Sequence, residues 1–177
     1  KASAQPLLVW GGLVLSTSLI IWLLITNTPK GEGGGRWHLL WILMSLIGGV
    51  YQYKYNQLRS VPDSIVSRTI GYMWGVFGIS VFVLWAINIC AITFGGISVR
   101  QIIPMTPTII LFMGLSVAVT GLVINRLFIS VIGAVACAIC SYFSLVNQGV
   151  NELLCVAVTA VFTLIVPGLY LKFSNGR

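Results

Sequence analysis

Charged side chains are too scarce in this chain for a water-soluble fold. Asp, Glu, Lys and Arg make up 7% of the 177 residues, whereas hydrophobic residues make up 58%. A soluble globular domain carries about 25% charged residues. Because so few charges cannot cover the surface of a chain of this length, the lipid bilayer is the expected surroundings of most of it.

Apolar stretches of the chain are long enough to cross the roughly 30 Å hydrocarbon layer as helices. Six of them are expected, and the second is the shortest. Their ranges are 7–26, 37–53, 69–94, 106–125, 127–146 and 152–173. The sequence therefore predicts an all-α membrane protein with six transmembrane helices in one bundle, a single domain over 1–177.

Several residues predict where these helices begin, end or bend. Thr106 is the expected N-cap of the fourth helix, with Pro107 in the first helical position. Asn151 is the expected N-cap of the sixth helix, with Glu152 in its first turn. Pro167 lies inside the sixth stretch and lacks a backbone N–H, so we expect a kink there.

The basic residues predict the orientation in the membrane. The formal charge of +7 comes from residues spread along the chain near the ends of apolar stretches, which argues against a nucleic-acid partner. One side would hold both termini and seven basic residues, and the other side three. The seven are Lys1, Lys54, Arg59, Arg68, Arg126, Lys172 and Arg177, and the three are Lys30, Arg36 and Arg100. Cytoplasmic loops are enriched in Lys and Arg, so the N- and C-termini are expected in the cytoplasm.

Short similarities between the two halves leave a three-plus-three inverted repeat open. Residues 45–50 resemble 130–135, residues 81–84 resemble 161–164, and Gly12-Leu13 could match Gly114-Leu115. Inverted repeats recur among transporters. Apolar helices built from few residue types also match by chance, so the repeat and coincidence both remain open.

Small residues four positions apart predict close helix packing. The pairs are Gly12 and Ser16, Gly71 and Gly75, Gly114 and Ala118, and Ala134 and Ala138. Small side chains at this spacing let two helix backbones approach within a membrane. Packing inside the chain is the simpler interpretation, and a homodimer or an interface with another membrane protein is the alternative.

Polar residues within or next to the apolar stretches are the candidates for a binding pocket. Asn88 lies inside the third stretch and needs a hydrogen-bond partner on another segment. Asn147, Gln148, Asn151 and Glu152 share one short outer loop and could form the rim of a shallow pocket with it. A structural hydrogen bond for Asn88 and a solvated loop surface for the others are the competing interpretations.

No residue pattern predicts a catalytic, cofactor or metal site. Cys137 and Cys140 have C-x-x-C spacing but lie inside an apolar helix, where a thiol is poorly reactive. His38 is the only histidine, and one imidazole without neighbouring acids makes a poor metal site. No charged residue lies near the middle of a predicted span, which argues against ion coupling and hydrolysis.

The chain resembles a family of small six-span inner-membrane proteins of Bacteroidetes type. The resemblance rests on the stretches 6–11, 72–78, 113–115, 120–124 and 165–168, which read PLLVWG, YMWGVFG, MGL, TGLVI and IVPG. It implies a multi-pass protein of the bacterial inner membrane and no particular activity. Members of this family carry a polar segment before the first span, and the start at Lys1 without Met leaves room for one upstream.

Three classes of function are compatible with these features. The missing ionisable groups and the small-residue faces favour a non-enzymatic sensor, regulatory or assembly component. A small-solute carrier, or a substrate-binding membrane subunit like those of energy-coupling-factor vitamin transporters, is the alternative by analogy of fold. A membrane enzyme fits least, because no nucleophile, base or metal cluster is present. Whether a small molecule binds is open.

Overall fold

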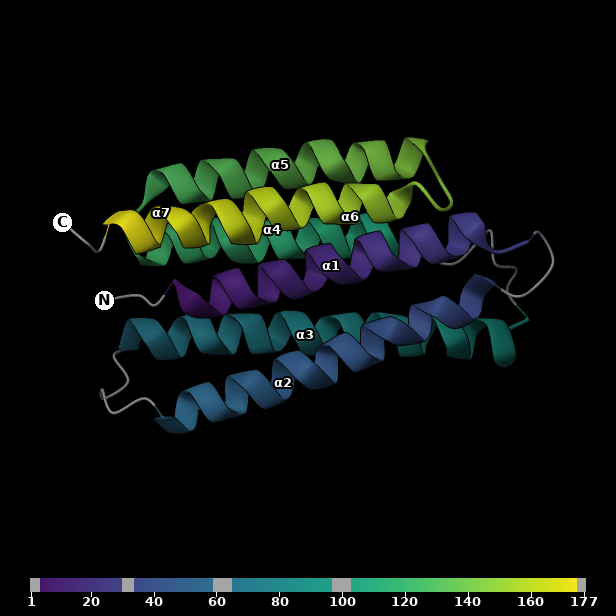
Figure 1. The fold of residues 1–177 in the computed structure, drawn as a ribbon, viewed down its shortest axis with the longest axis horizontal. Coiled ribbons are helices and arrows are strands. Elements are labelled where there is room, and N and C mark those ends of the chain that lie inside the picture. Colours follow the sequence, from purple (N-terminus) through teal and green to yellow (C-terminus); the bar gives the residue numbers. More distant parts are fainter. Residues whose placement is uncertain (1–3, 30–33, 59–64, 97–102, 175–177) are drawn as a thin grey trace.

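The computed structural model describes residues 4–29, 34–58, 65–96 and 103–174 (Figure 1). All regular structure in these ranges is helical. The elements are α1 (Gln5–Asn27), a 3₁₀ turn η1 (Gly34–Leu39), α2 (Leu40–Leu58), α3 (Ile65–Thr93), α4 (Met105–Val123), α5 (Leu127–Val146), α6 (Glu152–Ala160), a π-helical turn η3 (Val161–Ile165) and α7 (Val166–Ser174).

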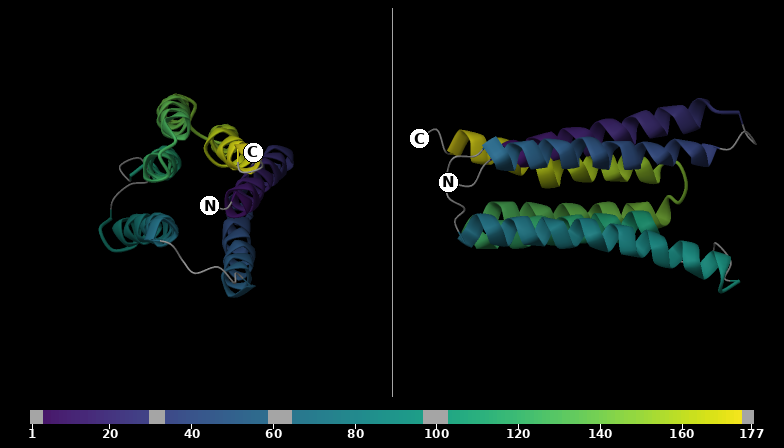
Figure 2. Two further views of the ribbon diagram at one scale, coloured as in Figure 1. Left: turned by 90° about the vertical axis from the view of Figure 1, so that its left-hand side faces the viewer. Right: turned by 90° about the horizontal axis from the view of Figure 1, so that it is seen from below.

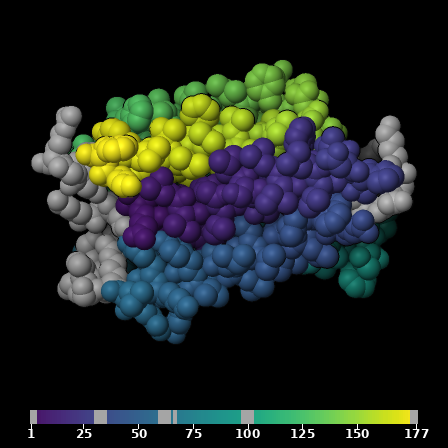
Figure 3. All heavy atoms as spheres, in the orientation of Figure 1, coloured from purple at the N-terminus to yellow at the C-terminus, as the bar shows by residue number. Residues whose placement is uncertain are grey.

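The helices run along one common axis and form two layers (Figure 2). One layer holds α6–α7, α1 and α2, and the other holds α5, α4 and α3. The space-filling view shows α1 lying between α6–α7 and α2 (Figure 3). The described ends nearest to the two termini lie at the same end of the bundle, as they do in a chain with an even number of passes.

Packing is concentrated in α1, α4, α5 and the α6–α7 segment. α4 packs along α5, and α1 packs along α6 and η3. One cluster of buried side chains joins Met113, Val117, Ile129, Leu164 and Leu171. A second cluster joins Ile110, Cys137, Cys140 and Val156. By contrast, α2 packs mainly on α1 and α3 mainly on α4, so these two helices form the periphery.

The connection between α4 and α5 is a tight turn that the chain closes with backbone hydrogen bonds. Asn125 has a φ of 55°, a left-handed conformation that asparagine tolerates better than most residues. The Arg126 N–H donates to the Gly121 carbonyl at 2.7 Å, and the Asn125 N–H donates to the Leu122 carbonyl at 3.0 Å. This is a Schellman motif, and it confirms the hairpin expected at Asn125-Arg126.

Within the residues that the structure describes, five helical segments are long and apolar enough to cross a membrane. They are Gln5–Asn27, Arg68–Thr93, Met105–Val123, Leu127–Val146 and Glu152–Phe173. They correspond to all the predicted spans except the second, and the range 127–146 agrees at both ends. These features fit a multi-pass membrane protein.

The second expected span, 37–53, is not among these five. Residues 37–39 belong to the 3₁₀ turn, and α2 begins only at Leu40. Toward its end α2 carries Gln52, Lys54, Asn56 and Gln57, which leave too short an apolar run. α2 nevertheless packs along α1 (Figure 3).

Two helix starts and one helix interruption differ in detail from expectation. Pro104, not Thr106, is the N-cap of α4, which begins at Met105. Asn151 is the N-cap of α6, as expected, but its side chain makes no capping hydrogen bond. Instead the Glu152 carboxylate accepts a hydrogen bond from the Gly149 N–H at 2.9 Å. Before Pro167 the helix widens into the π turn η3, and the Val166 N–H bonds the Val161 carbonyl.

Candidate functional site

The predicted small-residue pairs fall into two groups in space. Gly114 packs against Cys137 and the Gly133 carbonyl of α5, where a Cβ atom would collide. The Ala118 carbonyl accepts a hydrogen bond from the Ser130 hydroxyl at 2.6 Å. This pair therefore does lie in a close helix interface, between α4 and α5.

The other predicted pairs do not pack inside the chain. A Cβ atom built on Gly12, Gly71 or Gly75 meets nothing within 4 Å. Ser16 is exposed, and its hydroxyl donates a hydrogen bond to the Gly12 carbonyl of the same helix. Ala134 and Ala138 are exposed on α5. For these positions the prediction of packing within the chain is wrong, because the spacing marks a small-residue face without specifying what that face meets.

Other glycines make the close contacts of this bundle. Gly121 and Gly133 bring α4 and α5 together, and Gly48 of α2 lies against the indole ring of Trp10. Gly11 meets Leu164 and Ile165, and Gly168 meets Leu8. Gly114 and Gly121 are seven residues apart, so they lie on the same face of α4, two turns from each other. This spacing is the feature of the sequence that could have predicted the glycine contacts between α4 and α5.

The expected polar pocket is not assembled in the described part of the chain. Asn88 is 5% exposed, and its side-chain amide donates to the Ile103 carbonyl at 3.0 Å. The Asn147 amide donates to its own helix at Phe143, and Gln148 and Asn151 are exposed in the α5–α6 turn. Asn88 thus ties α3 to the segment before α4, which agrees with its structural interpretation.

The groups with reactive potential lie in separate places. His38 is in the η1 turn, where partial burial lowers the pKa of its imidazole and the nearby Glu152 carboxylate partly opposes this. Cys137 and Cys140 are free thiols buried in the α4–α5–α6 core. Among the described residues, no group of three or more His, Cys, Asp or Glu side chains could hold a metal ion.

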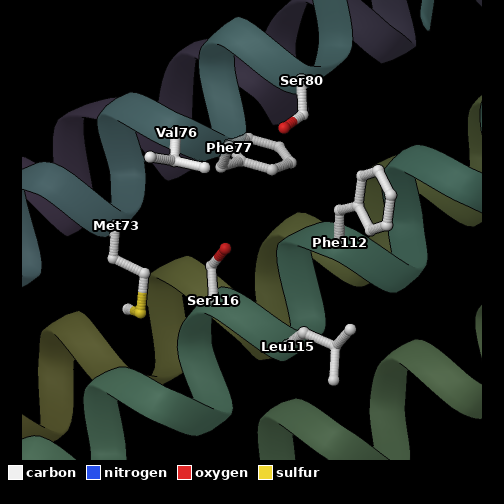
Figure 4. Close-up of a pocket in the computed structure, with 7 residues that line it drawn as sticks. All are labelled: Met73, Val76, Phe77, Ser80, Phe112, Leu115 and Ser116. Atoms are coloured by element: carbon white, nitrogen blue, oxygen red, sulfur yellow. The ribbon is translucent and has the colours of Figure 1, made fainter.

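A shallow groove of about 190 Å³ lies between the middle parts of α3 and α4 (Figure 4). Its walls are mostly apolar, but one serine hydroxyl from each helix faces it. The lining residues are Met73, Val76, Phe77, Ser80, Phe112, Leu115 and Ser116. None of these residues was predicted from the sequence to belong to a site.

Most hydroxyl groups of the apolar helices are satisfied by their own backbone. They donate to the carbonyl four residues earlier, which is the usual solution where water is absent. This group comprises Ser16, Ser18, Thr26, Thr28, Ser45, Thr69, Thr108, Thr120, Thr159 and Thr163. Ser130 and Ser141 instead bond carbonyl groups of α4. The structure gives no such bond to Ser80 or Ser116, nor to Ser144, which is fully buried.

Comparison of the chain with protein families, with curated proteins and with solved structures found no match. The geometry of the helices is therefore the basis on which a function can be assigned.

Proposed function

We propose that this chain is a non-enzymatic, multi-pass membrane component that acts by binding another membrane protein through the outward face of α3. The observation that carries the proposal is the open space at Gly71 and Gly75. Small residues at this spacing allow another helix to approach closely. A sensor, regulatory or assembly role fits such a face, and the partner is a second copy of the chain or a different membrane protein.

The low burial of α3 supports this assignment. In the most apolar stretch of α3, 11% of the residues are buried inside the chain. In the corresponding stretch of the last membrane-length segment, residues 152–173, 50% are buried. A helix that gives little of its surface to its own fold has much left for lipid or for a partner. The glycine pair distinguishes a partner from lipid, because lipid chains gain nothing from a missing side chain.

The test compares association of the wild-type chain with two glycine variants. Gly75→Leu should weaken association, and Gly49→Leu is the matched control, since Gly49 is also exposed with nothing within 4 Å of its Cβ position. Energy transfer between labelled copies in nanodiscs measures self-association. Co-purification from native membranes with quantitative mass spectrometry measures hetero-association. Indistinguishable association of all three chains would refute the proposal.

No observation on the described residues favours the carrier alternative. A carrier needs a polar cavity between helices near the bilayer midplane. The side-chain amide of Asn88, which was expected to line such a cavity, donates to the Ile103 carbonyl instead.

Six crossings with cytoplasmic termini in a bacterial inner membrane form the second part of the proposal. It is supported by the placement of α2 beside α1 and by the shared end of the described N- and C-terminal segments. The predicted asymmetry of basic residues includes Lys1, Lys30, Arg59, Arg100 and Arg177, which lie outside the described residues.

Cysteine labelling tests this topology. Single cysteines at Asn56 and Gln148, in a chain lacking exposed Cys90, should label from opposite sides of intact cells. Labelling of both from the same side would refute the topology.

The three-plus-three repeat has one geometric feature in its favour. The sequence alignment pairs Gly48 of α2 with Gly133 of α5. Each glycine meets the helix that precedes its own: Gly48 meets Trp10 of α1, and Gly133 meets Val117 of α4. Equivalent close contacts at equivalent positions are what two related halves would retain.

A further inference from the structure

The groove between α3 and α4 has features that separate it from the other apolar surfaces of the bundle. It occupies about two turns of α3 and one turn of α4, near the middle of both helices (Figure 4). Met73 and Phe77 come two residues after Gly71 and Gly75, so they lie about 200° away around α3. The groove is therefore on a different flank from the proposed protein-binding face, and a ligand bound in it would leave that face free.

The Ser116 hydroxyl is the decisive group in this groove. Ser116 is 8% exposed and faces the groove, yet its hydroxyl makes no hydrogen bond in the structure. Ser80 contributes a second hydroxyl without a bond from the opposite wall. A hydroxyl donor that faces hydrocarbon finds no acceptor there, which is unfavourable. Two such donors facing one groove are complementary to a ligand that carries an acceptor oxygen.

The position and size of the groove restrict that ligand. Ester carbonyl groups of glycerolipids lie at the membrane interface, about 15 Å from the midplane, so their oxygens do not reach the middle of a spanning helix. A cavity of about 150 Å³ holds one benzene ring, and the groove measures about 190 Å³. The phenyl rings of Phe77 and Phe112 are placed to contact the faces or edges of such a ring.

We propose that the α3–α4 groove binds a lipid-soluble ring compound bearing a carbonyl group, of the quinone class. The Ser80 and Ser116 hydroxyls donate to the carbonyl oxygen, and Phe77 and Phe112 contact the ring. An apolar tail extends into the bilayer past Val76 and Leu115, which are 62% and 56% exposed. A docked helix is the competing occupant, and it would need a longer groove than these few turns provide.

Binding is tested with a decyl-substituted 1,4-benzoquinone added to the full chain in nanodiscs. Quinones quench indole fluorescence, and the centroid of the Trp74 ring lies 5.6 Å from the centroid of the Phe77 ring, which lines the groove. The wild-type chain should show saturable quenching, and Trp74→Phe should remove most of it. Decylbenzene, which has the tail and ring but no carbonyl, should compete at least about tenfold more weakly, as expected for two lost hydrogen bonds.

The serine variants test the role of the hydroxyls. The double variant Ser80→Ala/Ser116→Ala should raise the apparent Kd about tenfold or more. Ser116→Thr, which keeps a hydroxyl, should retain more affinity than Ser116→Ala. The matched control is Ser16→Ala/Ser45→Ala, because both of these hydroxyls are satisfied by their own helices. A second readout is thermal stability without ligand, which Ser116→Ala should leave unchanged or raise.

Several results would overturn the proposal. The first two are the absence of saturable quenching and an affinity for decylbenzene equal to that for the quinone. The others are a quinone affinity of the double serine variant equal to that of the wild-type chain, and a clear loss of stability of Ser116→Ala without ligand. A change of oligomeric state in the double variant, together with no effect on the quinone, would assign the groove to a docked helix instead.

Discussion

The glycines of α4 and those of α3 occur in helices of similar composition but face opposite environments. Gly114 lies against Cys137 and the backbone of α5, whereas Gly75 faces open space. The α4–α5 pair also shares the Ser130–Ala118 hydrogen bond, and α3 is linked to its neighbours chiefly through Asn88 and a few apolar side chains. The difference shows that a small residue in a membrane helix indicates close approach only when the partner surface is known.

The largest expected effect on stability comes from comparing leucine at Gly114 with leucine at Gly75. Gly114→Leu should destabilise the chain by about 3 kcal/mol or more, because the new atoms overlap α5. Gly75→Leu should leave the isolated chain unchanged or stabilise it by about 0.5–1 kcal/mol, because leucine favours the helix. Thermal unfolding in detergent measures both. Equal destabilisation would mean that α3 packs inside the chain after all.

A smaller effect is expected in α2, whose only buried described residue is Gly48. Gly48→Ala should cost about 1–3 kcal/mol, since the methyl group overlaps the Trp10 indole. Gly49→Ala, one residue later and exposed, should be neutral or slightly stabilising. The comparison by thermal unfolding tests whether α2 is attached to α1 at this contact, and identical behaviour of the two variants would argue that it is not.

Asn88→Ala should destabilise the α3–α4 connection by about 1–2 kcal/mol. The variant leaves the Ile103 carbonyl without its donor and removes a bond of 3.0 Å. Protease sensitivity between α3 and α4 should rise along with the loss of thermal stability. An unchanged Tm and an unchanged cleavage rate would show that this hydrogen bond does not hold the periphery to the core.

The smallest effect is expected for Ser130→Ala, at about 1 kcal/mol, from loss of the bond to the Ala118 carbonyl. Ser16→Ala provides the control, because the Ser16 hydroxyl is exposed and bonds only its own helix. Unfolding of the two variants in the same detergent gives the difference. If Ser16→Ala were the more harmful change, the Ser130–Ala118 bond between two helices would contribute less to stability than a bond within one helix.

The sequence predicted the helices better than their contacts. Apolar length and the Asn125-Arg126 turn located α5 at Leu127–Val146 and the hairpin before it, because both depend on local residues. The helix of the second predicted span begins only at Leu40, because Trp37 and His38 belong to a 3₁₀ turn that composition does not distinguish from helix. Which glycines meet a partner depends on how the helices are rotated, and hydrophobicity does not fix that rotation when lipid and protein are both apolar.

The candidate groove was not predicted for a related reason. Ser80 and Ser116 resemble the other serines and threonines of the apolar helices until the positions of α3 and α4 are known. The polar residues that the sequence did single out are the more conspicuous ones, and conspicuous amides such as Asn88 already have a partner. At the α3–α4 groove the unmatched groups are small hydroxyls.

The wide turn η3 is in effect one surplus residue carried inside the last membrane-length segment. Each residue advances an α-helix by about 100°, so removing one position between Val161 and Ile165 would swing α7 round by roughly that angle. Gly168 would then no longer face Leu8, and a bulkier side chain would be driven against the start of α1. The extra residue therefore sets the rotation of α7 about its own axis. A sequence one residue shorter, with the same composition, could not pack α7 against the start of α1 in this way.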